Sequence, residues 1–307
     1  MNKKILIDAS YICYRGFHSN SKINKDGKIT GLCNKEGLGT GMPYAAIQTM
    51  FYLMVKHKWK AEDVILVWDG RPQWRYDLYL EYKAGRKKDT HPESMSISIQ
   101  FKIARCLFDF LGFSYIRHKD YEGDDIIASF ATKEYTNCDE ITIVGSDHDM
   151  YQCLRDNVNI MRLHQGKPEE IYTMNNFIDE FKIKPELYVF LQALSGCTTD
   201  KVPGMHGIGE NSVLKLFELN NVQKIFNNEP DIIFPDKRTE TMYKKNYNSW
   251  EKARDFKLVK LVTDCAYDVI DNKICSEKVR EWFVRLGFKQ YLLPNNFDRL
   301  IKIFGGK

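Results

Sequence analysis

The chain has 307 residues, a net charge of +4 and 28% charged residues, an ordinary composition for one large or two modest globular domains. No run of 18 apolar residues predicts a membrane span, and the N-terminal segment lacks the apolar core of a signal peptide, so we expect a cytoplasmic protein with no membrane partner. The eight cysteines form no Cys-x-x-Cys pair, which excludes the common zinc signatures and favours reduced thiols.

Short apolar runs alternate with helical patterns through the first half of the chain. We predict strands at residues 4–7, 64–68, 113–116, 140–144 and 158–162, and helices at 44–55, 101–111 and 124–135. This alternation predicts an α/β fold with a mostly parallel sheet and crossover helices. Residues 18–42 and 83–98 lack such a pattern, and we predict a long loop or hairpin for the first and a flexible segment for the second.

The second part of the chain has mainly helical patterns. We predict helices at residues 185–194, 211–219, 239–262 and 276–286, with a Gly-rich turn at 203–209 before the second of them. The chain is therefore expected to divide into an α/β core at residues 1–184 and a helical region at 185–307. The Gly-rich turn could present backbone N–H groups to a phosphate, or it could simply link two packed helices.

Acidic residues stand at the ends of the predicted strands. These residues are Asp8, Asp69, Glu122, Asp124, Asp125, Asp147 and Asp149. Because ligands of open α/β sheets bind at the carboxyl ends of parallel strands, we expect these side chains to gather on one rim. Oxygen ligands without His or Cys partners suit Mg²⁺ or Mn²⁺ rather than zinc, and two such ions can assist phosphodiester hydrolysis.

Each acidic residue also has a simpler interpretation. A single Asp after a strand is commonly a turn residue or a helix N-cap, and acids in a first helical turn are favoured by the helix dipole. The repetition at four strand ends favours the metal interpretation, because capping alone rarely produces it.

A basic segment lies between residues 71 and 105. It carries Arg71, Arg75, Lys83, Arg86, Lys87, Lys88, Lys102 and Arg105, against four acidic residues. Such a run is usually a solvated face. Its position beside Tyr82 and before a predicted helix favours binding of a single nucleic-acid strand, with the cations along the phosphates and the aromatic ring offered for stacking.

Seven motifs occur along the chain in a recognisable order. They are Ile-Leu-Ile-Asp at 5–8, Val-Trp-Asp-Gly at 67–70, Trp-Arg at 74–75, Tyr-Lys-Ala-Gly-Arg at 82–86, Tyr-Glu-Gly-Asp-Asp at 121–125, Val-Gly-Ser-Asp-His-Asp at 144–149, and a last motif that runs from Leu-Ser-Gly at 194–196 to Asp200 and is followed by Val-Pro-Gly-Met-His-Gly-Ile-Gly at 202–209. Together they resemble the 5′ nucleases, the family of the bacteriophage 5′–3′ exonucleases and ribonuclease H, the 5′ nuclease domain of bacterial DNA polymerase I, and the flap endonucleases.

The resemblance implies a PIN-like fold with a helical arch at about residues 83–100 and a helix–three-turn–helix in the helical region. It implies a metal-dependent 5′–3′ exonuclease and 5′ flap endonuclease that leaves 5′-phosphate and 3′-hydroxyl ends. The expected substrates are DNA with free 5′ ends or flaps, and the RNA of RNA–DNA hybrids, in replication or repair. A monomer is expected, of a length similar to a phage enzyme, with a replication polymerase or a single-strand-binding protein as plausible partners.

The resemblance also assigns roles to individual residues. The first metal site would use Asp8, Asp69, Glu122, Asp124 and Asp125, and the second Asp147, Asp149 and Asp200. Both would bind Mg²⁺, which Mn²⁺ can replace. Lys83 and Arg86 would contact the scissile phosphate from the arch. The residues expected to bind DNA are Arg71, Arg75, Tyr82, Lys87, Lys88, Gly204, Gly207 and Gly209; Tyr82 could instead pack inside the arch. A K⁺ ion is expected at the helix–three-turn–helix.

One motif departs from the family pattern Gly-Asp-x-x-Asp-Asn. Here Cys197 replaces the first Asp and Lys201 replaces the Asn. Since Mg²⁺ prefers oxygen ligands, we expect a second metal site that is weak, shifted or filled only with substrate. Two alternatives stay open: a flap-binding protein whose catalysis has decayed, and a PIN-type ribonuclease.

Overall fold

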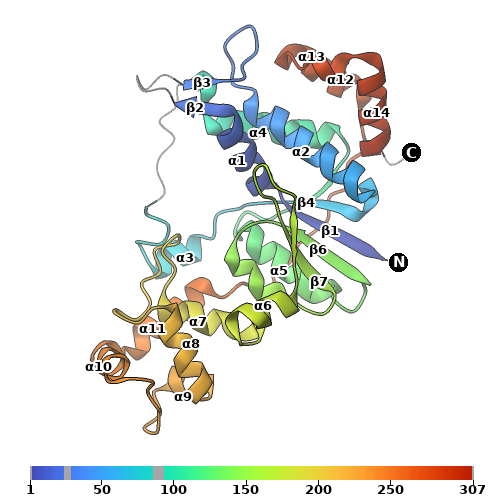
Figure 1. Cartoon of the computed structure of the whole chain (residues 1–307). Helices are drawn as coiled ribbons and strands as arrows, with labels where there is room; N and C mark the ends of the chain where they lie inside the picture. The colour runs from blue at the N-terminus through green and yellow to red at the C-terminus, as the bar shows by residue number, and fades with distance from the viewer. Residues whose placement is uncertain (1, 24–28, 86–92, 306–307) are drawn as a thin grey trace.

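The computed structural model describes residues 2–23, 29–85 and 93–305, and its centre is a six-stranded sheet (Figure 1). The strand order is β5-β4-β1-β6-β7-β8. The strands are β1 Lys3–Asp8, β4 Val64–Trp68, β5 Ser114–Arg117, β6 Glu140–Val144, β7 Val158–Arg162 and β8 Glu170–Tyr172. The first five are parallel, and β8 joins β7 in the antiparallel direction at one edge. The mostly parallel α/β sheet predicted from the sequence is thus confirmed.

Side-chain alternation in the strands builds a core on each face of the sheet. In β1, Ile5 and Ile7 belong to one cluster of buried residues and Leu6 to the other. All residues of β4 are buried, which explains its continuous apolar sequence. The helices α1 Ala9–Asn20, α2 Gly41–His57 and α4 Ile97–Phe110 cover the first face, and α5 Gly123–Glu134 and α6 Met174–Phe181 cover the second.

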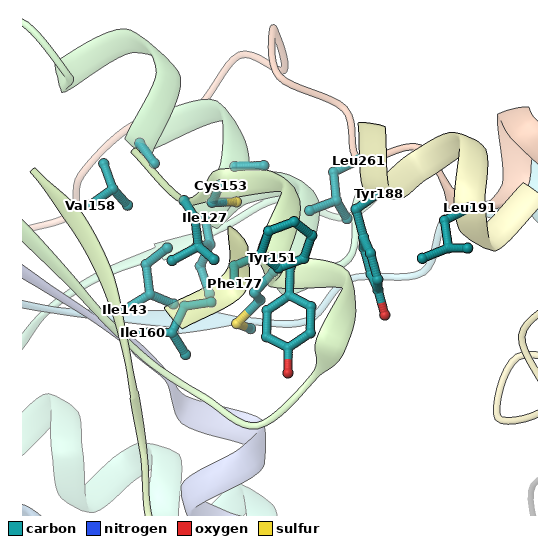
Figure 2. Packing of buried hydrophobic residues seen from close by; sticks show 14 of the residues in the cluster. Ile127, Ile143, Tyr151, Cys153, Val158, Ile160, Phe177, Tyr188, Leu191 and Leu261 are labelled. Carbon is teal, nitrogen blue, oxygen red and sulfur yellow. The ribbon is translucent and has the colours of Figure 1, made fainter. Parts of the chain in front are cut away.

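The second face is closed by an aromatic cluster that continues into the helical region (Figure 2). Tyr151 packs edge-on against Phe177 and Tyr188 at centroid distances of 5.4 and 5.2 Å. Tyr188 opens α7 Tyr188–Ser195, so this cluster fixes α7 beside the rim of the sheet. The expected division at 184/185 therefore does not coincide with a break in the core, which runs on to Val213 and Leu216.

The helical region occupies two separate places in the molecule (Figure 1). At one end lie α7, α8 Glu210–Leu219, α9 Val222–Asn227, α10 Lys237–Asn246 and α11 Ser249–Val259. The last three helices are α12 Ser276–Leu286, α13 Lys289–Leu292 and α14 Pro294–Gly305, and they return to the face of α2 and α4. The first group lies beside α3 Gln73–Leu78, where Tyr76 and Leu78 pack against a cluster that includes Val189 of α7 and Leu258 of α11.

Two sequence predictions need correction or refinement. The helix predicted at 239–262 is interrupted, because the Asn248 side chain accepts hydrogen bonds from the N–H groups of Trp250 and Glu251 and so begins α11. Residues 18–42 contain the end of α1 and a hairpin of β2 Ser21–Ile23 and β3 Ile29–Gly31, the second of the two predicted forms. Of the segment predicted to be flexible at 83–98, residues 86–92 lie outside the described residues, and its last two residues begin α4. In the described parts, no helix is both long and apolar enough to span a bilayer.

Candidate functional site

Neighbouring parallel strands bring the acidic residues to one rim of the sheet. Asp8 is the last residue of β1, and Asp69 directly follows β4. Glu122 is the N-cap of α5, whose first turn carries Asp124 and Asp125. Asp147 is the N-cap of the short 3₁₀ helix His148–Cys153 after β6. Since β5, β4, β1 and β6 are consecutive in the sheet, these residues face one shared region.

Close backbone packing holds Asp69 in place. The Gly123 N–H donates to Asp69 Oδ1 at 2.7 Å, and the Gly70 N–H donates to the Tyr121 carbonyl at 2.8 Å. A Cβ atom on Gly70 would lie 1.9 Å from the His118 carbonyl oxygen. Glycine is therefore required after Asp69, because only glycine lets the end of β4 meet the loop before α5.

Five carboxylates on this rim have no ion-pair partner among the described residues: Asp8, Asp69, Asp124, Asp147 and Asp149. Burial, followed by the charge of Asp69, raises the pKa of Asp8 to about 8. Burial and the charge of Asp147 raise the pKa of Asp149 to about 8, and the same two causes raise the pKa of Asp124 well above its ordinary value. Mutual repulsion at this rim therefore favours a bound cation.

The other three carboxylates each have a cationic partner in the protein. Arg75 donates from Nη1 and Nη2 to the two oxygens of Asp125 at 2.6 and 2.7 Å. Lys83 Nζ lies 2.6 Å from Glu122 Oε1 and 3.3 Å from Asp200 Oδ2. Although burial opposes ionisation, the charges of Lys83 and Arg75 lower the pKa of Glu122. The rim thus has an unpaired group of five acids and a paired group of three.

This pairing corrects three assignments made from the sequence. Arg75 is 1% exposed and its guanidinium is held by Asp125, so its assignment as a DNA contact is wrong. Tyr82 is 2% exposed, and its hydroxyl donates to Glu122 Oε2 at 2.9 Å, so it packs in the protein rather than stacking on a base. Asp125 is fully buried, and Arg75 and the Val262 N–H occupy its oxygens, which leaves it a structural role.

A cavity of about 530 Å³ opens beside the unpaired acids. Asp8, Asp147, Asp149 and Asp200 line it together with Cys197. The Cys197 Sγ lies 3.0 Å from Thr199 Oγ1, and backbone hydrogen bonds of 2.9 Å in both directions join Cys197 to Val202. Cys197 therefore stands on the wall where the family pattern has an acid, and burial raises the pKa of its thiol.

The donor set of the rim fits a hard divalent cation. All five unpaired side chains offer carboxylate oxygens, the ligands that Mg²⁺ and Mn²⁺ prefer. Among the residues that the structure describes, no three acidic, His or Cys side chains already stand at the spacing of one ion. Hydrogen bonds from the protein hold two of these carboxylates away from the others. Gln192 donates to Asp149 Oδ1, and the Gly123 N–H donates to Asp69 Oδ1. Binding an ion requires these carboxylates to turn toward one another.

The Gly-rich turn lies between α7 and α8 and connects to the acidic cavity. Gly204 has a φ of +64°, and a Cβ atom there would lie 2.2 Å from the Gly196 nitrogen. Its N–H donates to Asp255 Oδ2 at 3.0 Å, so this hydrogen bond stabilises the turn and the N–H is not available to a phosphate. Gly207 and Gly209 are exposed, and Gly209 is the N-cap of α8.

The remaining basic residues are only partly described. Arg71 is exposed, with its guanidinium 5.0 Å from the centre of the Tyr76 ring. Lys83 has a left-handed φ of 55°. Its N–H donates to the Asp200 carbonyl at 3.0 Å, so the start of the expected arch is joined to a residue of the paired acidic group. Arg86, Lys87 and Lys88 lie outside the described residues.

Two residues of the site were not identified from the sequence. Gln192 is 6% exposed in an otherwise apolar stretch of α7 and binds Asp149, and a polar residue inside such a stretch is a usable signal. Asp255 is 1% exposed on α11 and holds the Gly-rich turn from 51 positions along the chain. Its role depends on tertiary structure, and its local sequence carries no sign of it.

Comparison with known proteins places this arrangement in a family. The family model described as "5'-3' exonuclease, N-terminal resolvase-like domain" matches residues 3–182. The chain belongs to this family. A 5′–3′ exonuclease of Bacillus subtilis is 30% identical over 235 residues, which cover 74% of each chain.

Other relatives are longer proteins or more distant structures. The thermostable DNA polymerase I of Thermus thermophilus is 29% identical over 217 residues, 70% of this chain and 24% of the polymerase, so the match spans about a quarter of that relative. The bacteriophage T5 D15 flap endonuclease, solved as a pseudo-enzyme-product complex with DNA and metal ions, has a TM-score of 0.64 and 18% identity over 98% of this chain and 99% of its own. That likeness shows a shared fold.

Proposed function

We propose that the protein is a divalent-metal-dependent 5′ nuclease that hydrolyses DNA phosphodiesters at free 5′ ends and 5′ flaps. The observation that carries this proposal is the group of five unpaired carboxylates on adjacent strand ends, in a chain of the 5′–3′ exonuclease family. The family membership favours this function over a PIN-type ribonuclease and over a binding protein with decayed catalysis.

Asp8, Asp69 and Asp124 would hold one Mg²⁺ ion, and Asp147 and Asp149 a second, with Mn²⁺ able to replace either. When bound, such ions lower the pKa of water and stabilise the charge of the leaving oxygen. The second set is poorer than usual, because a thiol stands at Cys197 and the Asp200 carboxylate is paired with Lys83. We expect this second ion to bind weakly without substrate.

During the reaction, Lys83 would move from the Glu122 carboxylate to the phosphate of the substrate. Its side chain is only 7% exposed, and its Nζ atom contacts the carboxylates of Glu122 and Asp200. These two residues belong to the same rim as the unpaired acids. An incoming phosphate brings negative charge to this place, and an ammonium group at hydrogen-bond distance would orient it and stabilise its developing charge. Glu122 would then act as the resting partner that keeps Lys83 in position.

The duplex beside the cleavage site would bind at the Gly-rich turn. The exposed N-terminus of α8 at Gly209 offers backbone N–H groups to a phosphate. A K⁺ ion at the same turn, action on RNA–DNA hybrids, and work with a polymerase or single-strand-binding protein inside the cell are further parts of this proposal, and they rest on the family resemblance.

The test is cleavage of a 5′-labelled flap duplex with Mg²⁺, beside the variants Asp69→Asn and Lys83→Ala. We expect cleavage near the junction by the parent and a loss of at least about 100-fold in each variant, as is typical when an electrostatic catalytic group is removed. Tight binding of the flap in EDTA without cleavage after Mg²⁺ or Mn²⁺ addition would support the decayed binding protein instead. Preference for single-stranded RNA would support the PIN-type ribonuclease.

A further inference from the structure

The helix α11 contacts both the Gly-rich turn and the segment that leads from α3 to the acidic rim. Its Asp255 side chain holds the turn, because Oδ2 accepts a hydrogen bond from the Gly204 N–H at 3.0 Å. On the same helix, Leu258 belongs to one buried cluster with Tyr82, and Tyr79 packs against this cluster. The helix therefore joins the proposed duplex contact to the segment that carries the proposed catalytic lysine.

Arg254 makes the contact between these two places. Its Nε donates to Asp255 Oδ1 at 2.8 Å, and its Nη2 lies 2.7 Å from the same oxygen. Its Cζ lies 4.4 Å from the centre of the Tyr79 ring and 5.3 Å from the centre of the Trp250 ring. Adjacent residues of a helix do not face each other, so this ion pair needs an arginine that bends along the helix. The Tyr79 ring provides the surface that holds the guanidinium in this bent position.

Tyr79 begins the short turn that brings Lys83 to the rim. The Tyr82 N–H donates to the Tyr79 carbonyl at 3.0 Å. The next residue, Lys83, donates its N–H to the Asp200 carbonyl, also at 3.0 Å. The position of the Tyr79 backbone therefore affects where Lys83 starts. The contacts form one series, which runs through Gly204, Asp255, Arg254, Tyr79 and Lys83.

The surroundings of Arg254 indicate a positional role rather than a contact with DNA. The residue is buried, and its guanidinium is held by one oxygen of the Asp255 carboxylate. The other oxygen of that carboxylate accepts from the Gly204 N–H. A planar guanidinium with donors in fixed directions holds its partners in one geometry, which a lysine does not. The link therefore keeps the Gly-rich turn and residues 79–83 at a defined separation.

We propose that Arg254 is a positioning residue that fixes the distance between the Gly-rich turn and Lys83 and so selects which phosphodiester is cut. This role rests on the nuclease function and the duplex contact proposed above. A duplex bound at the turn presents one position of its backbone to Lys83 and the unpaired acids. Because a misplacement of about 1 Å can slow an enzymatic reaction about 100-fold, a fixed separation determines both the position and the rate of cleavage.

The test is the position of the cut made by Arg254→Met, which keeps an apolar side chain of similar length and removes the guanidinium. A 5′-labelled flap duplex is cleaved with Mg²⁺ under single-turnover conditions, and the products are separated at single-nucleotide resolution. We expect the variant to spread its products over neighbouring positions and to cut about tenfold more slowly at the main position of the parent. A product distribution equal to that of the parent, at any rate of cleavage, would overturn the proposal, because a loss of folded protein slows all cuts equally.

A second variant tests the link from its other end. Arg254→Met leaves Asp255 buried without its ion pair, whereas Tyr79→Leu keeps that pair and removes only the ring. Tyr79→Leu should spread the products in the same way, and Tyr79→Phe, which keeps the ring, should cut as the parent does. The matched control is Arg280→Met, since Arg280 lies over the Phe297 ring at 4.0 Å on α12. Parent-like products from Tyr79→Leu, or spread products from Arg280→Met, would contradict the proposal.

A measurement without DNA separates this inference from the nuclease function. Amide hydrogen exchange at Gly204 reports on the Gly-rich turn, and exchange at Tyr82 and Lys83 reports on the turn that leads to the rim. Arg254→Met should speed exchange at both places and leave the amides of β1 at the rates of the parent. Faster exchange at Gly204 alone, or at neither place, would overturn the link. If the parent cuts no flap, the nuclease function fails, and the exchange rates still decide whether Arg254 joins the two segments.

Discussion

Arg75 and Asp125 form a two-pronged ion pair at the centre of the site, with N–O distances of 2.6 and 2.7 Å and both residues at most 1% exposed. Asp125 also takes part in the N-terminal capping box of α5, and Arg75 reaches the Lys260 carbonyl at 3.2 Å. The pair therefore ties α3, α5 and the end of α11 together behind the catalytic rim. It places Glu122 without itself facing the substrate.

Breaking this pair should affect stability more than DNA binding. We expect Arg75→Gln to lower the free energy of unfolding by about 3–5 kcal/mol, because it leaves Asp125 buried without its partner. Urea denaturation measures this, with the exposed Arg71→Gln as the control, for which we expect little change. If Arg75→Gln kept the stability of the parent and lost affinity for duplex DNA, Arg75 would be a DNA contact after all.

The metal-free protein should lose stability as the pH rises from about 4 to 8. The pKa values of Asp8 and Asp149 are raised to about 8 in the fold from 3.8, mainly by burial. Between pH values of about 4 and 8 the folded state binds more protons than the unfolded state. The stability that these two groups contribute is therefore present at low pH and is lost as the pH rises through about 8. Melting temperatures in EDTA across this range measure the effect.

Addition of Mg²⁺ should reverse that loss at pH 8, because the cation replaces the protons that offset the repulsion. Asp149→Asn should melt at a higher temperature than the parent in EDTA at pH 8 and should gain less from Mg²⁺. Identical melting curves with EDTA and with Mg²⁺ at pH 8 would show that the unpaired acids do not bind the ion.

Replacement of Cys197 with Asp should strengthen the binding of Mg²⁺ at the second proposed metal site. Cys197→Asp adds a carboxylate to the cavity wall beside Asp149 and Asp200, and oxygen is the ligand that Mg²⁺ prefers. We expect the Mg²⁺ concentration for half-maximal cleavage to fall several-fold, or about 1 kcal/mol of binding free energy. The control is Cys33→Asp, which places the same charge at an exposed cysteine elsewhere. An unchanged Mg²⁺ dependence in Cys197→Asp would show that this position does not take part in metal binding.

The strands and the acidic rim were predictable because their signals are local. The run at residues 64–68 is short, continuously apolar and rich in β-branched residues, which is typical of a buried strand. The carboxyl ends of parallel strands share one edge of the sheet, so an Asp at such an end lies on that edge. The pairing within the rim was not predictable, because Arg75 and Lys83 meet Asp125, Glu122 and Asp200 only in the folded chain. For the same reason the basic segment was assigned to DNA as a whole, although one of its arginines is buried.

The Gly-rich turn should tolerate a side chain at one glycine and reject it at another. Alanine at Gly204 would bring Cβ within 2.2 Å of the Gly196 nitrogen at a φ of +64°, whereas a Cβ at Gly209, which has a φ of −92°, meets nothing within 4 Å. We expect Gly204→Ala to lower stability by about 1–3 kcal/mol through strain and to weaken duplex binding with it. Gly209→Ala keeps the backbone N–H and should bind as the parent does. Melting temperatures and duplex affinities of the two variants give the comparison, and a stable Gly204→Ala protein with normal affinity would show that the turn does not have this rigid form.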